Sequence, residues 1–285
     1  MSITKQRTIN KKVSCSGIGL HSGKEVKISL LPGVENGGII FRRIDVKSEN
    51  EIHANYKNVS TTNLGTTISN KSGVKVATIE HLMAAIWGCG IDNLVVEIDS
   101  EETPVMDGSS SAFIFLIECA GTHGQEEPRK TIEILKKIEV TDGDKSLSIE
   151  PDREFSVNLQ IDFNHSQLGE QNFEFHTEHT SFKNDISRAR TFAFEKDIDA
   201  MRAAGLALGG SLQNAVVIGE NGVLNEDGVR YPDEFVRHKM LDFIGDIFLS
   251  GGYFIGKFTA IKSGHGINNQ LLHKLFSDKT AYRII

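Results

Sequence analysis

Phe235-Val-Arg-His238-Lys-Met-Leu-Asp242-Phe-Ile-Gly-Asp246 carries most of the structural and chemical information in this chain. Its apolar residues recur at helical spacing and no proline interrupts them, so the stretch predicts a helix. His238, Asp242 and Asp246 follow at intervals of four, which places them on one face of that helix. Three ionisable groups on an apolar helix are costly to bury unless a metal ion or a charged partner compensates them. The stretch alone is compatible with a metal site and equally with an ion pair between His238 and Asp242.

Two further histidines lie in contexts that favour a metal site. Glu80 and His81 open an apolar run that ends at Trp87, and Thr78 could serve as the N-cap of a helix there. His265 follows a predicted strand and lies between two glycines, which let the backbone bring a side chain close to a ligand. Each histidine alone is more simply explained as a hydrogen-bonded core or surface residue. Taken together with the first stretch, they favour a metal site.

The composition is that of an ordinary globular protein. The 285 residues are 39% hydrophobic and 24% charged, which is enough chain for a sizeable core and for two domains. A net charge of -7 without a lysine or arginine cluster argues against nucleic acid as a partner. The amino terminus lacks the apolar core of a signal peptide, and no uncharged apolar stretch is long enough to cross a bilayer. These features predict neither a secreted nor a membrane-spanning protein.

The cysteines limit the chemistry of the predicted metal site. Cys15, Cys89 and Cys119 are odd in number and lack the paired spacing of a thiolate zinc site. The ligands must therefore be histidines and carboxylates. Unpaired cysteines also fit a reducing cytoplasm.

The chain divides at residues 121–130, a polar segment with two glycines and one proline between an apolar run and a new strand pattern. We predict an N-terminal domain of residues 1–127 and a C-terminal domain of residues 128–285. Each begins with two strand-like runs around a turn, and residues 81–88 align without gaps on residues 238–245. The predicted fold is α+β: two similar domains from a duplicated unit, each a layer of mostly antiparallel sheet packed on helices, with the equivalent helices and the site at the domain interface. Coincidence over so short an alignment is the alternative.

Several motifs follow one another along nearly the whole chain: Gly17-Ile-Gly-Leu-His-Ser-Gly23, Ile79-Glu-His-Leu-Met-Ala-Ala85, Pro104-Val-Met-Asp-Gly-Ser109, Ser187-Arg-Ala-Arg-Thr-Phe192, Gly205-Leu-Ala-Leu-Gly-Gly-Ser211, Val223-Leu-Asn-Glu-Asp-Gly228, Phe235-Val-Arg-His-Lys-Met-Leu-Asp242 and Lys262-Ser-Gly-His-Gly266. In this order they closely resemble the UDP-3-O-acyl-N-acetylglucosamine deacetylases of lipid A biosynthesis. The resemblance implies a Zn²⁺ amidohydrolase that removes acetate from the glucosamine nitrogen of an acylated UDP-sugar, the committed step towards lipid A in Gram-negative bacteria. We accordingly expect a cytoplasmic enzyme, monomeric, that acts on this small-molecule substrate.

The resemblance also implies roles for the residues around the metal ion. The family's zinc ligands match His81, His238 and Asp242, and its catalytic base matches Glu80. Three protein ligands leave a coordination position free, and a carboxylate beside the ion can then act as general base. Glu80 is therefore expected not to be a ligand.

Three further residues match catalytic positions of the family. His265 would lie opposite the base and stabilise the oxyanion or protonate the leaving nitrogen, and Asp246 would hold the imidazole proton. Thr191 matches a threonine that contacts the oxyanion. Without the resemblance, Thr191 would be interpreted as a strand residue that faces solvent.

The resemblance extends to substrate binding. Lys239 would meet the diphosphate as a point charge, although a helical lysine is usually just solvated. Phe163 aligns with an aromatic residue that stacks on uracil, although a strand phenylalanine is more often a core residue, and Phe192 is a further expected contact. Residues 191–216 would wall a tunnel for the acyl chain, with a helix at 194–204, a glycine-rich strand at 205–211 that includes Gly210, and Leu20 near the mouth.

Other functions stay open at this stage. A noncatalytic zinc-stabilised module that binds sugar nucleotides would need four protein ligands and no free acid or base, so Glu80 and His265 argue against it. A zinc hydrolase of a different amide is harder to exclude because the pocket, not the chemistry, selects the substrate. Fe²⁺ could also replace Zn²⁺. The pairs His176/His179 and Asp142/Asp144 are predicted to be an exposed strand pair and a hairpin turn rather than metal sites.

Overall fold

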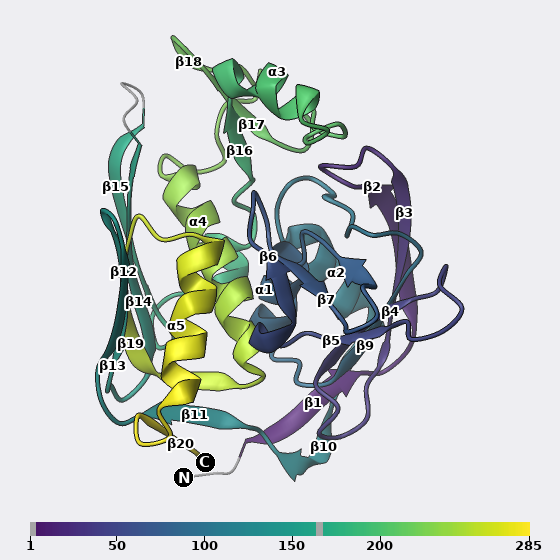
Figure 1. The fold of residues 1–285 in the computed structure, drawn as a ribbon, viewed down its shortest axis with the longest axis vertical. Coiled ribbons are helices and arrows are strands. Elements are labelled where there is room, and N and C mark those ends of the chain that lie inside the picture. Colours follow the sequence, from purple (N-terminus) through teal and green to yellow (C-terminus); the bar gives the residue numbers. More distant parts are fainter. Residues whose placement is uncertain (1–3, 164–167) are drawn as a thin grey trace.

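Two β-sheets form the outer layers of the fold, and four helices lie between them (Figure 1). The computed structural model describes residues 4–163 and 168–285. The sheet of the first half contains β2 (Val13–Ile18), β3 (Glu25–Pro32), β4 (Ile39–Arg43), β5 (Glu51–His53) and β9 (Leu94–Ile98). The main strands of the second half's sheet are β12 (Ile138–Asp142), β13 (Lys145–Glu150), β14 (Phe155–Phe163), β15 (Gly169–His176) and β19 (Tyr253–Ile261). Two short strands, β11 (Thr131–Ile134) and β20 (Tyr282–Ile284), extend this sheet beside the start of β19. The helices between them are α1 (Glu80–Gly88), α2 (Ser111–Ala120), α4 (Glu234–Ile247) and α5 (His265–Ser277).

The five main strands of each sheet share one topology. Their strand orders are β2-β3-β9-β4-β5 and β12-β13-β19-β14-β15. In each, the last strand inserts at the centre, antiparallel to the second strand and parallel to the third. One helix precedes this central strand and another follows it in both halves. The α+β architecture is thus confirmed, with sheets that are mixed although most of their pairs are antiparallel. The shared order leads us to propose that the two halves arose by duplication.

The strand pairing changes partners near residue 128. β10 (Thr122–Pro128) pairs with β1 (Lys5–Ile9), whereas β11 (Thr131–Ile134) pairs with β19 and with β20 (Tyr282–Ile284). We therefore propose the domain boundary between residues 127 and 128. One continuous cluster of buried hydrophobic residues nevertheless contains side chains from both halves. The helix layers of the two halves therefore share a core.

Helices α1 and α4 pack closely against each other at this interface. A Cβ atom on Gly245 would lie 2.1 Å from the carbonyl oxygen of Glu80, so only glycine allows the two backbones to approach this far. Both helices are almost completely buried because each has neighbours on several sides. Each fully buried aliphatic side chain, such as Leu82 or Ile244, contributes about 1.5–3 kcal/mol to the free energy of folding. This packing brings the chemical groups of α1 and α4 to one place.

The remaining elements are short. They include an insert above the two helix layers, formed by β16 (Phe192–Phe194), α3 (Glu195–Ala203), β17 (Val216–Gly219) and β18 (Gly222–Val223) (Figure 1). The others are β6 (Val59–Thr61), β7 (Thr67–Ser69), β8 (Lys75–Val76), a π-helical turn at Phe182–Ile186 and 3₁₀ turns at Tyr56–Asn58 and Phe248–Ser250. Within the described ranges, no helix has both the length and the apolar character that a membrane crossing requires.

The expected strand at residues 205–211 is wrong. This segment consists of turns that lie against the loop before β3, with hydrogen bonds from Leu208 N to His21 O and from Gly209 N to Leu20 O. Gly205 and Ala207 have positive φ values of 75° and 52°, which interrupt an extended chain. A glycine-rich apolar sequence fits both structures, and the contact with a distant loop decides between them. The expected helix before it is confirmed as α3.

The structure also differs from the predictions at the starts of two helices. Thr78 is not an N-cap: its φ is 57°, its hydroxyl donates to Glu102, and Ile79 occupies the cap position without a side-chain hydrogen bond. The left-handed backbone at Thr78 differs from the extended backbone that is typical of an N-cap residue. His265 is the first residue of α5, with Gly264 as N-cap, and does not lie in a loop.

Candidate active site

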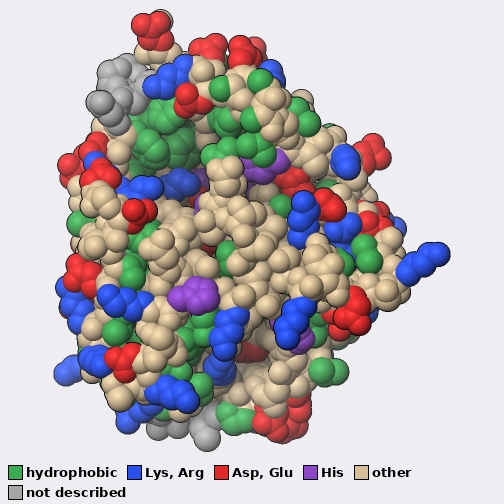
Figure 2. Space-filling view, in the orientation of Figure 1, with side chains coloured by type: hydrophobic (Ala, Val, Ile, Leu, Met, Phe, Trp, Pro, Cys, Tyr) green, Lys and Arg blue, Asp and Glu red, His purple; other side chains and the backbone are tan. Residues whose placement is uncertain are grey.

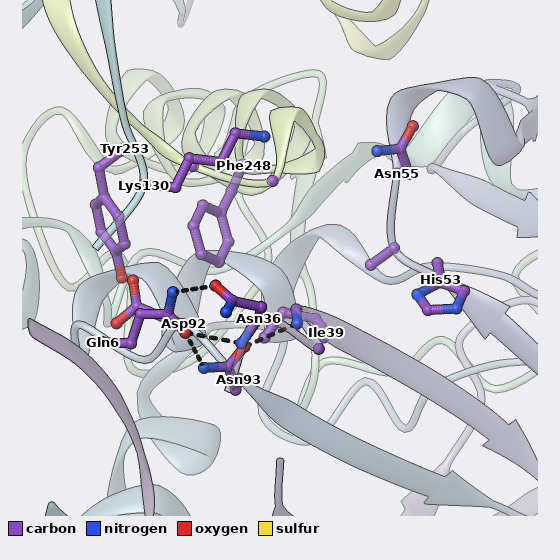
Figure 3. A pocket seen from close by; sticks show the side chains of 15 residues that line it. Gln6, Asn36, Ile39, His53, Asn55, Asp92, Asn93, Lys130, Phe248 and Tyr253 are labelled. Carbon is purple, nitrogen blue, oxygen red and sulfur yellow. Dashed lines mark hydrogen bonds between the residues drawn. The ribbon is translucent and has the colours of Figure 1, made fainter. Parts of the chain in front are cut away.

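The interface between the halves contains two separate cavities. One, of about 250 Å³, lies near Phe248 and Lys130 (Figure 3). Its polar side chains mostly satisfy one another: Gln6 accepts from Asn93 Nδ2 at 2.7 Å and donates to Asn36 Oδ1 at 2.7 Å. The other, of about 410 Å³, lies where α1, α4 and α5 meet, and the predicted ionisable residues line it except Asp246, which lies behind His265. This second cavity is therefore the candidate active site.

Three buried side chains converge in the candidate site. The ligand atoms of His81, His238 and Asp242 all lie within 4.8 Å of one another. Asp242 Oδ1 lies 3.3 Å from Nε2 of His238 and 3.5 Å from Nε2 of His81. This oxygen is buried and accepts no hydrogen bond from any described residue. A buried carboxylate oxygen without a donor is costly unless a cation compensates it. The donor set thus fits a divalent metal ion.

The protonation states of these side chains also suit metal binding. Burial lowers the pKa of His238 to about 3, so the imidazole is neutral at physiological pH. Its Nδ1 donates to the carbonyl oxygen of Ala189 at 3.1 Å, which leaves the lone pair of Nε2 directed at the cluster. Burial raises the pKa of Asp242, but His238 in its charged form and the Lys239 ammonium outweigh this effect and hold that pKa well below its usual value. Two histidines and one carboxylate form a set typical of catalytic zinc sites. A neutral His238 also argues against a simple ion pair with Asp242.

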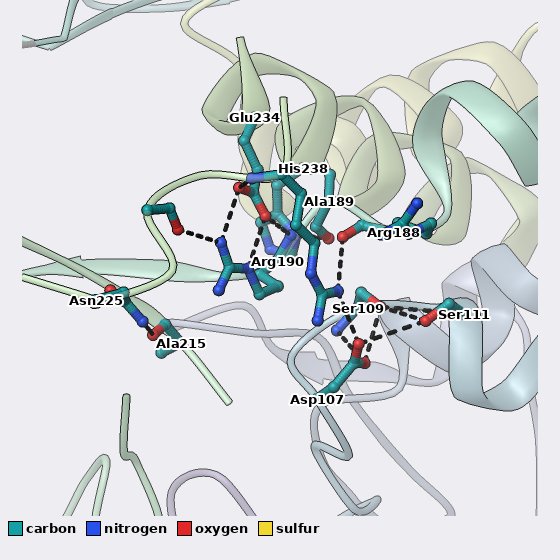
Figure 4. Close-up of polar contacts among 12 residues, drawn as sticks. Asp107, Ser109, Ser111, Arg188, Ala189, Arg190, Ala215, Asn225, Glu234 and His238 are labelled. Atoms are coloured by element: carbon teal, nitrogen blue, oxygen red, sulfur yellow. Dashed lines mark hydrogen bonds and ion pairs between the residues drawn. The ribbon is translucent and has the colours of Figure 1, made fainter. Parts of the chain in front are cut away.

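A buried ion pair fixes the segment that carries Ala189 (Figure 4). The Arg190 guanidinium donates to both oxygens of Glu234, at 2.9 and 3.1 Å, and to the carbonyl oxygen of Gly228 at 2.8 Å. Glu234 is the first residue of α4, so the pair attaches this segment one turn before His238. Loss of one partner from such a buried pair costs about 3–5 kcal/mol because the other charge is left unpaired. Sequence reasoning missed this pair, since no short-range spacing links residues 44 positions apart.

The predicted base lies beside the cluster. Glu80 is buried, and its Oε2 accepts a hydrogen bond from the backbone N–H of Thr66 at 2.9 Å. Burial raises its pKa, and the positive charge of His265 opposes this rise. Among the described residues, the group of possible metal ligands does not include Glu80. The carboxylate is therefore free to exchange a proton.

The predicted acid is paired with a carboxylate. His265 Nδ1 donates to Oδ2 of Asp246 at 2.8 Å. Burial disfavours the charged imidazole, but the Asp246 carboxylate and its hydrogen bond outweigh burial and raise the pKa of His265 to about 9. At neutral pH His265 is thus protonated. A cavity that holds a carboxylate base and a protonated imidazole has the two groups that acid–base catalysis requires.

Most of the other predicted residues line the candidate site or a cavity next to it. Thr191 and Phe192 line the candidate site and also a neighbouring cavity of about 440 Å³ beneath the insert. Lys239 lines the candidate site, and its Nζ donates to Oδ2 of Asp242 at 2.9 Å. Leu20 lines both cavities, and Gly210 lines the one beneath the insert. Phe163 packs edge-on against Phe192, with ring centroids 5.5 Å apart, and is not among the residues that line either cavity.

The β12–β13 hairpin contributes residues that the sequence did not indicate. The predicted turn is confirmed, since Asp142 pairs with Lys145 across its tip. Both residues also line the candidate site, a placement that depends on the tertiary packing of the hairpin. His176 and His179 take no part in the candidate site. His179 is exposed, as expected, whereas His176 is only partly exposed because its ring lies 3.4 Å from the Glu154 carboxylate.

The chain is similar to known proteins along nearly its whole length. Residues 6–277 match the sequence model of the family described as UDP-3-O-acyl N-acetylglycosamine deacetylase. Proteins named UDP-3-O-acyl-N-acetylglucosamine deacetylase from the OS155 and OS185 strains of Shewanella baltica are each 45% identical over 282 residues. The alignments cover 98% of this chain and 92% of each relative.

Proposed function

The chain belongs to the family of UDP-3-O-acyl-N-acetylglucosamine deacetylases, and we propose that the cavity between α1, α4 and α5 is its active site, with His81, His238 and Asp242 as ligands of one Zn²⁺ ion. The enzyme hydrolyses the N-acetyl group of UDP-3-O-(3-hydroxyacyl)-N-acetylglucosamine and releases acetate in lipid A biosynthesis. Family members are metal-dependent deacetylases. The observation that carries the metal assignment is the buried Asp242 Oδ1, which accepts no hydrogen bond from the described residues.

Glu80 acts as the general base in this proposal. When bound, Zn²⁺ polarises the amide carbonyl and makes a water molecule acidic enough to lose a proton near neutral pH. Oε2 of Glu80 is engaged by the Thr66 N–H, whereas Oε1 accepts no hydrogen bond from a described residue. Oε1 is thus the atom available to take the proton of the attacking water. Oε2 keeps its backbone donor throughout, so the carboxylate does not rotate when the proton moves.

His265 acts as the general acid. Its Nδ1 is engaged by Asp246, so the Nε2–H is left for the substrate. This N–H can stabilise the oxyanion and then protonate the glucosamine nitrogen as the C–N bond breaks. Thr191, on the opposite wall next to Phe192, supplies a hydroxyl for the oxyanion.

The substrate extends from this centre in two directions. The cavity beneath the insert is lined by apolar side chains, which include Ile198, Met201, Leu212, Val217 and Leu224, and suits the acyl chain. Figure 2 shows hydrophobic side chains gathered on this part of the surface. Lys239 carries the charge for the diphosphate, and Phe163 and Phe192 are the proposed aromatic contacts of the nucleotide end. The cytoplasmic location and the monomeric state remain predictions, as does the choice of Zn²⁺ over Fe²⁺.

Acetate release tests the proposed function. The purified enzyme is expected to release acetate from the acylated UDP-sugar, and far more slowly from the same sugar without its acyl chain. Binding of the sugar without acetate release would support the noncatalytic module instead. Equal turnover of both sugars would favour a hydrolase of a different amide.

Gly210→Phe tests the acyl-chain cavity. A Cβ at Gly210 would lie 3.7 Å from Leu20 Cδ1, so a phenyl ring there fills space next to the mouth. We expect the substitution to raise the KM for the long-chain substrate far more than the KM for a short-chain analogue, since each buried methylene contributes about 0.8 kcal/mol. Steady-state kinetics on both substrates measure this. Gly124→Phe is the control, because Gly124 has open space around it. Equal KM changes on both substrates in Gly210→Phe would place the chain elsewhere.

His265→Ala tests the acid–base pair through pH. Glu80 must be ionised, so activity rises with pH through its pKa; His265 must be protonated, so activity falls as pH rises through its pKa. The pKa of His265 is about 9 without a bound cation. A bound cation lowers this pKa, because it repels the charged imidazole. We expect a bell-shaped profile of kcat/KM with an alkaline limb at or below about pH 9.

The same variant is expected to keep its metal, to lose about 10²–10³ in turnover and to change or lose the alkaline limb. Near-wild-type activity with an unaltered profile would reduce His265 to a structural residue.

A further inference from the structure

Thr66 contacts both Glu80 and Asp246, the partner of His265, although it does not line the cavity. It lies directly before β7, and 2% of its surface is exposed. Its backbone N–H donates to Glu80 Oε2 at 2.9 Å, and its hydroxyl donates to Asp246 Oδ1 at 2.6 Å. Glu80 lies on α1 and Asp246 on α4. One residue of the N-terminal half therefore contacts the base and the carboxylate that orients the acid.

The hydroxyl of Thr66 completes the set of donors around Asp246. Oδ2 of Asp246 accepts from His265 Nδ1 at 2.8 Å and from Asn268 Nδ2 at 2.9 Å, and both of these donors lie on α5. Thr66 is the partner of the other oxygen. Without the Thr66 hydroxyl, the Asp246 carboxylate could rotate about its Cβ–Cγ bond. The His265 imidazole, which is hydrogen-bonded to Oδ2, would then move as well. The Asp246 side chain is only 4% exposed, so water is poorly placed to replace the hydroxyl.

The backbone of Thr66 has a parallel effect on Glu80. Gly65 has a φ of +156°, and a Cβ there would lie 3.0 Å from Glu80 Oε1. The glycine lets the chain wrap around the carboxylate, so the following N–H reaches Oε2 and Oε1 remains available.

We infer that Thr66 is a positioning residue for the deacetylation: its hydroxyl sets the orientation of His265 through Asp246, while its N–H sets the orientation of Glu80. The inference rests on the proposed function of this site. Thr66 does not touch the substrate, so its contribution lies in the geometry of the two groups that do.

Thr66→Val tests the hydroxyl, because valine has the same shape and keeps the N–H to Glu80. We expect kcat to fall about 10–100-fold, as for other partners that orient catalytic groups, with KM within about twofold and the metal content unchanged. Thr66→Ser should restore kcat to within about threefold, and Thr66→Cys, a weaker donor, should lie between Ser and Val.

Thr8→Val is the matched control. Thr8 is also 2% exposed and makes a hydrogen bond, from Gly33 N at 2.9 Å, but lies on β1 away from the site. This variant should lose stability and keep its kcat. If Thr66→Val also keeps its kcat, the inference is overturned.

Two readouts separate positioning from a general structural role. In a His265→Ala background, Thr66→Val should cause little further loss of kcat, since both changes act through one group; full additivity would contradict the inference. The Nδ1–H resonance of His265 in the metal-free protein should shift in Thr66→Val and not in Thr8→Val.

An unshifted resonance in Thr66→Val would also contradict the inference. This NMR measurement stands apart from the proposed function, because it needs no turnover. A wild-type enzyme that releases no acetate would overturn the function, whereas an active wild type with an equally active Thr66→Val would overturn only the role of Thr66.

Discussion

Alanine in place of His238 or Asp242 is expected to abolish both metal binding and turnover. Each change removes one of only three protein ligands, and the loss should exceed the roughly 10–100-fold cost of removing an outer partner of a ligand. His238→Ala also frees the Ala189 carbonyl, and Asp242→Ala leaves the Lys239 ammonium without its 2.9 Å partner. Metal analysis of the purified variants, together with acetate release, measures both effects.

The control for these variants is His176→Ala. His176 lies at the end of β15, far from the cluster in sequence and not among the cavity residues, so its loss should leave one equivalent of metal in place. Circular dichroism should show folded protein in all three variants, since α4 remains buried through its apolar residues. Wild-type metal content in both ligand variants would rule out the proposed coordination.

Glu80→Ala is expected to behave differently: it should keep its metal and lose about 10²–10⁴ in turnover. The carboxylate lies beside the three proposed ligands and is not in that group, so its removal should take away the proposed proton acceptor alone. Glu80→Gln should show the same loss, because its amide can still accept from the Thr66 N–H but cannot act as a base.

Metal analysis and single-turnover acetate release distinguish the possible outcomes for Glu80. Loss of metal from both Glu80 variants would make Glu80 a ligand. Retention of more than about a tenth of the wild-type turnover would exclude it as the base, since general-base removal costs at least about 10². Thermal unfolding of Glu80→Gln should change little, because the amide still accepts from the Thr66 N–H and burial already disfavours the ionised carboxylate.

Helical spacing made part of this site predictable. His238 and Asp242 lie one turn apart, so the periodicity of a single helix was enough to place them together. The repeated pattern around residues 81–88 and 238–245 likewise anticipated the packing of α1 on α4, although the common strand order of the two sheets became visible only in the structure. The fold class and the proposed metal ligands could therefore be predicted from local sequence patterns and long motifs.

The rest depends on contacts that no local pattern contains. Thr66 and Asp246 are 180 positions apart, and Arg190 and Glu234 are 44 apart, so only the packed structure brings them together. The wrong strand at residues 205–211 has the same origin. Its conformation follows from hydrogen bonds to the loop at Leu20 and His21, and the glycines in it permit both an extended chain and a turn.

Zinc titration of the metal-free enzyme tests the central claim most directly. Acetate release from the acylated UDP-sugar is measured as Zn²⁺ is added to chelator-treated protein, with His238→Ala treated in parallel. The proposed site predicts activity that rises in proportion to added Zn²⁺, levels off at one equivalent and stays near the background in the variant. Full turnover by the metal-free protein, or an equal recovery by His238→Ala, would contradict a catalytic metal ion held by His81, His238 and Asp242.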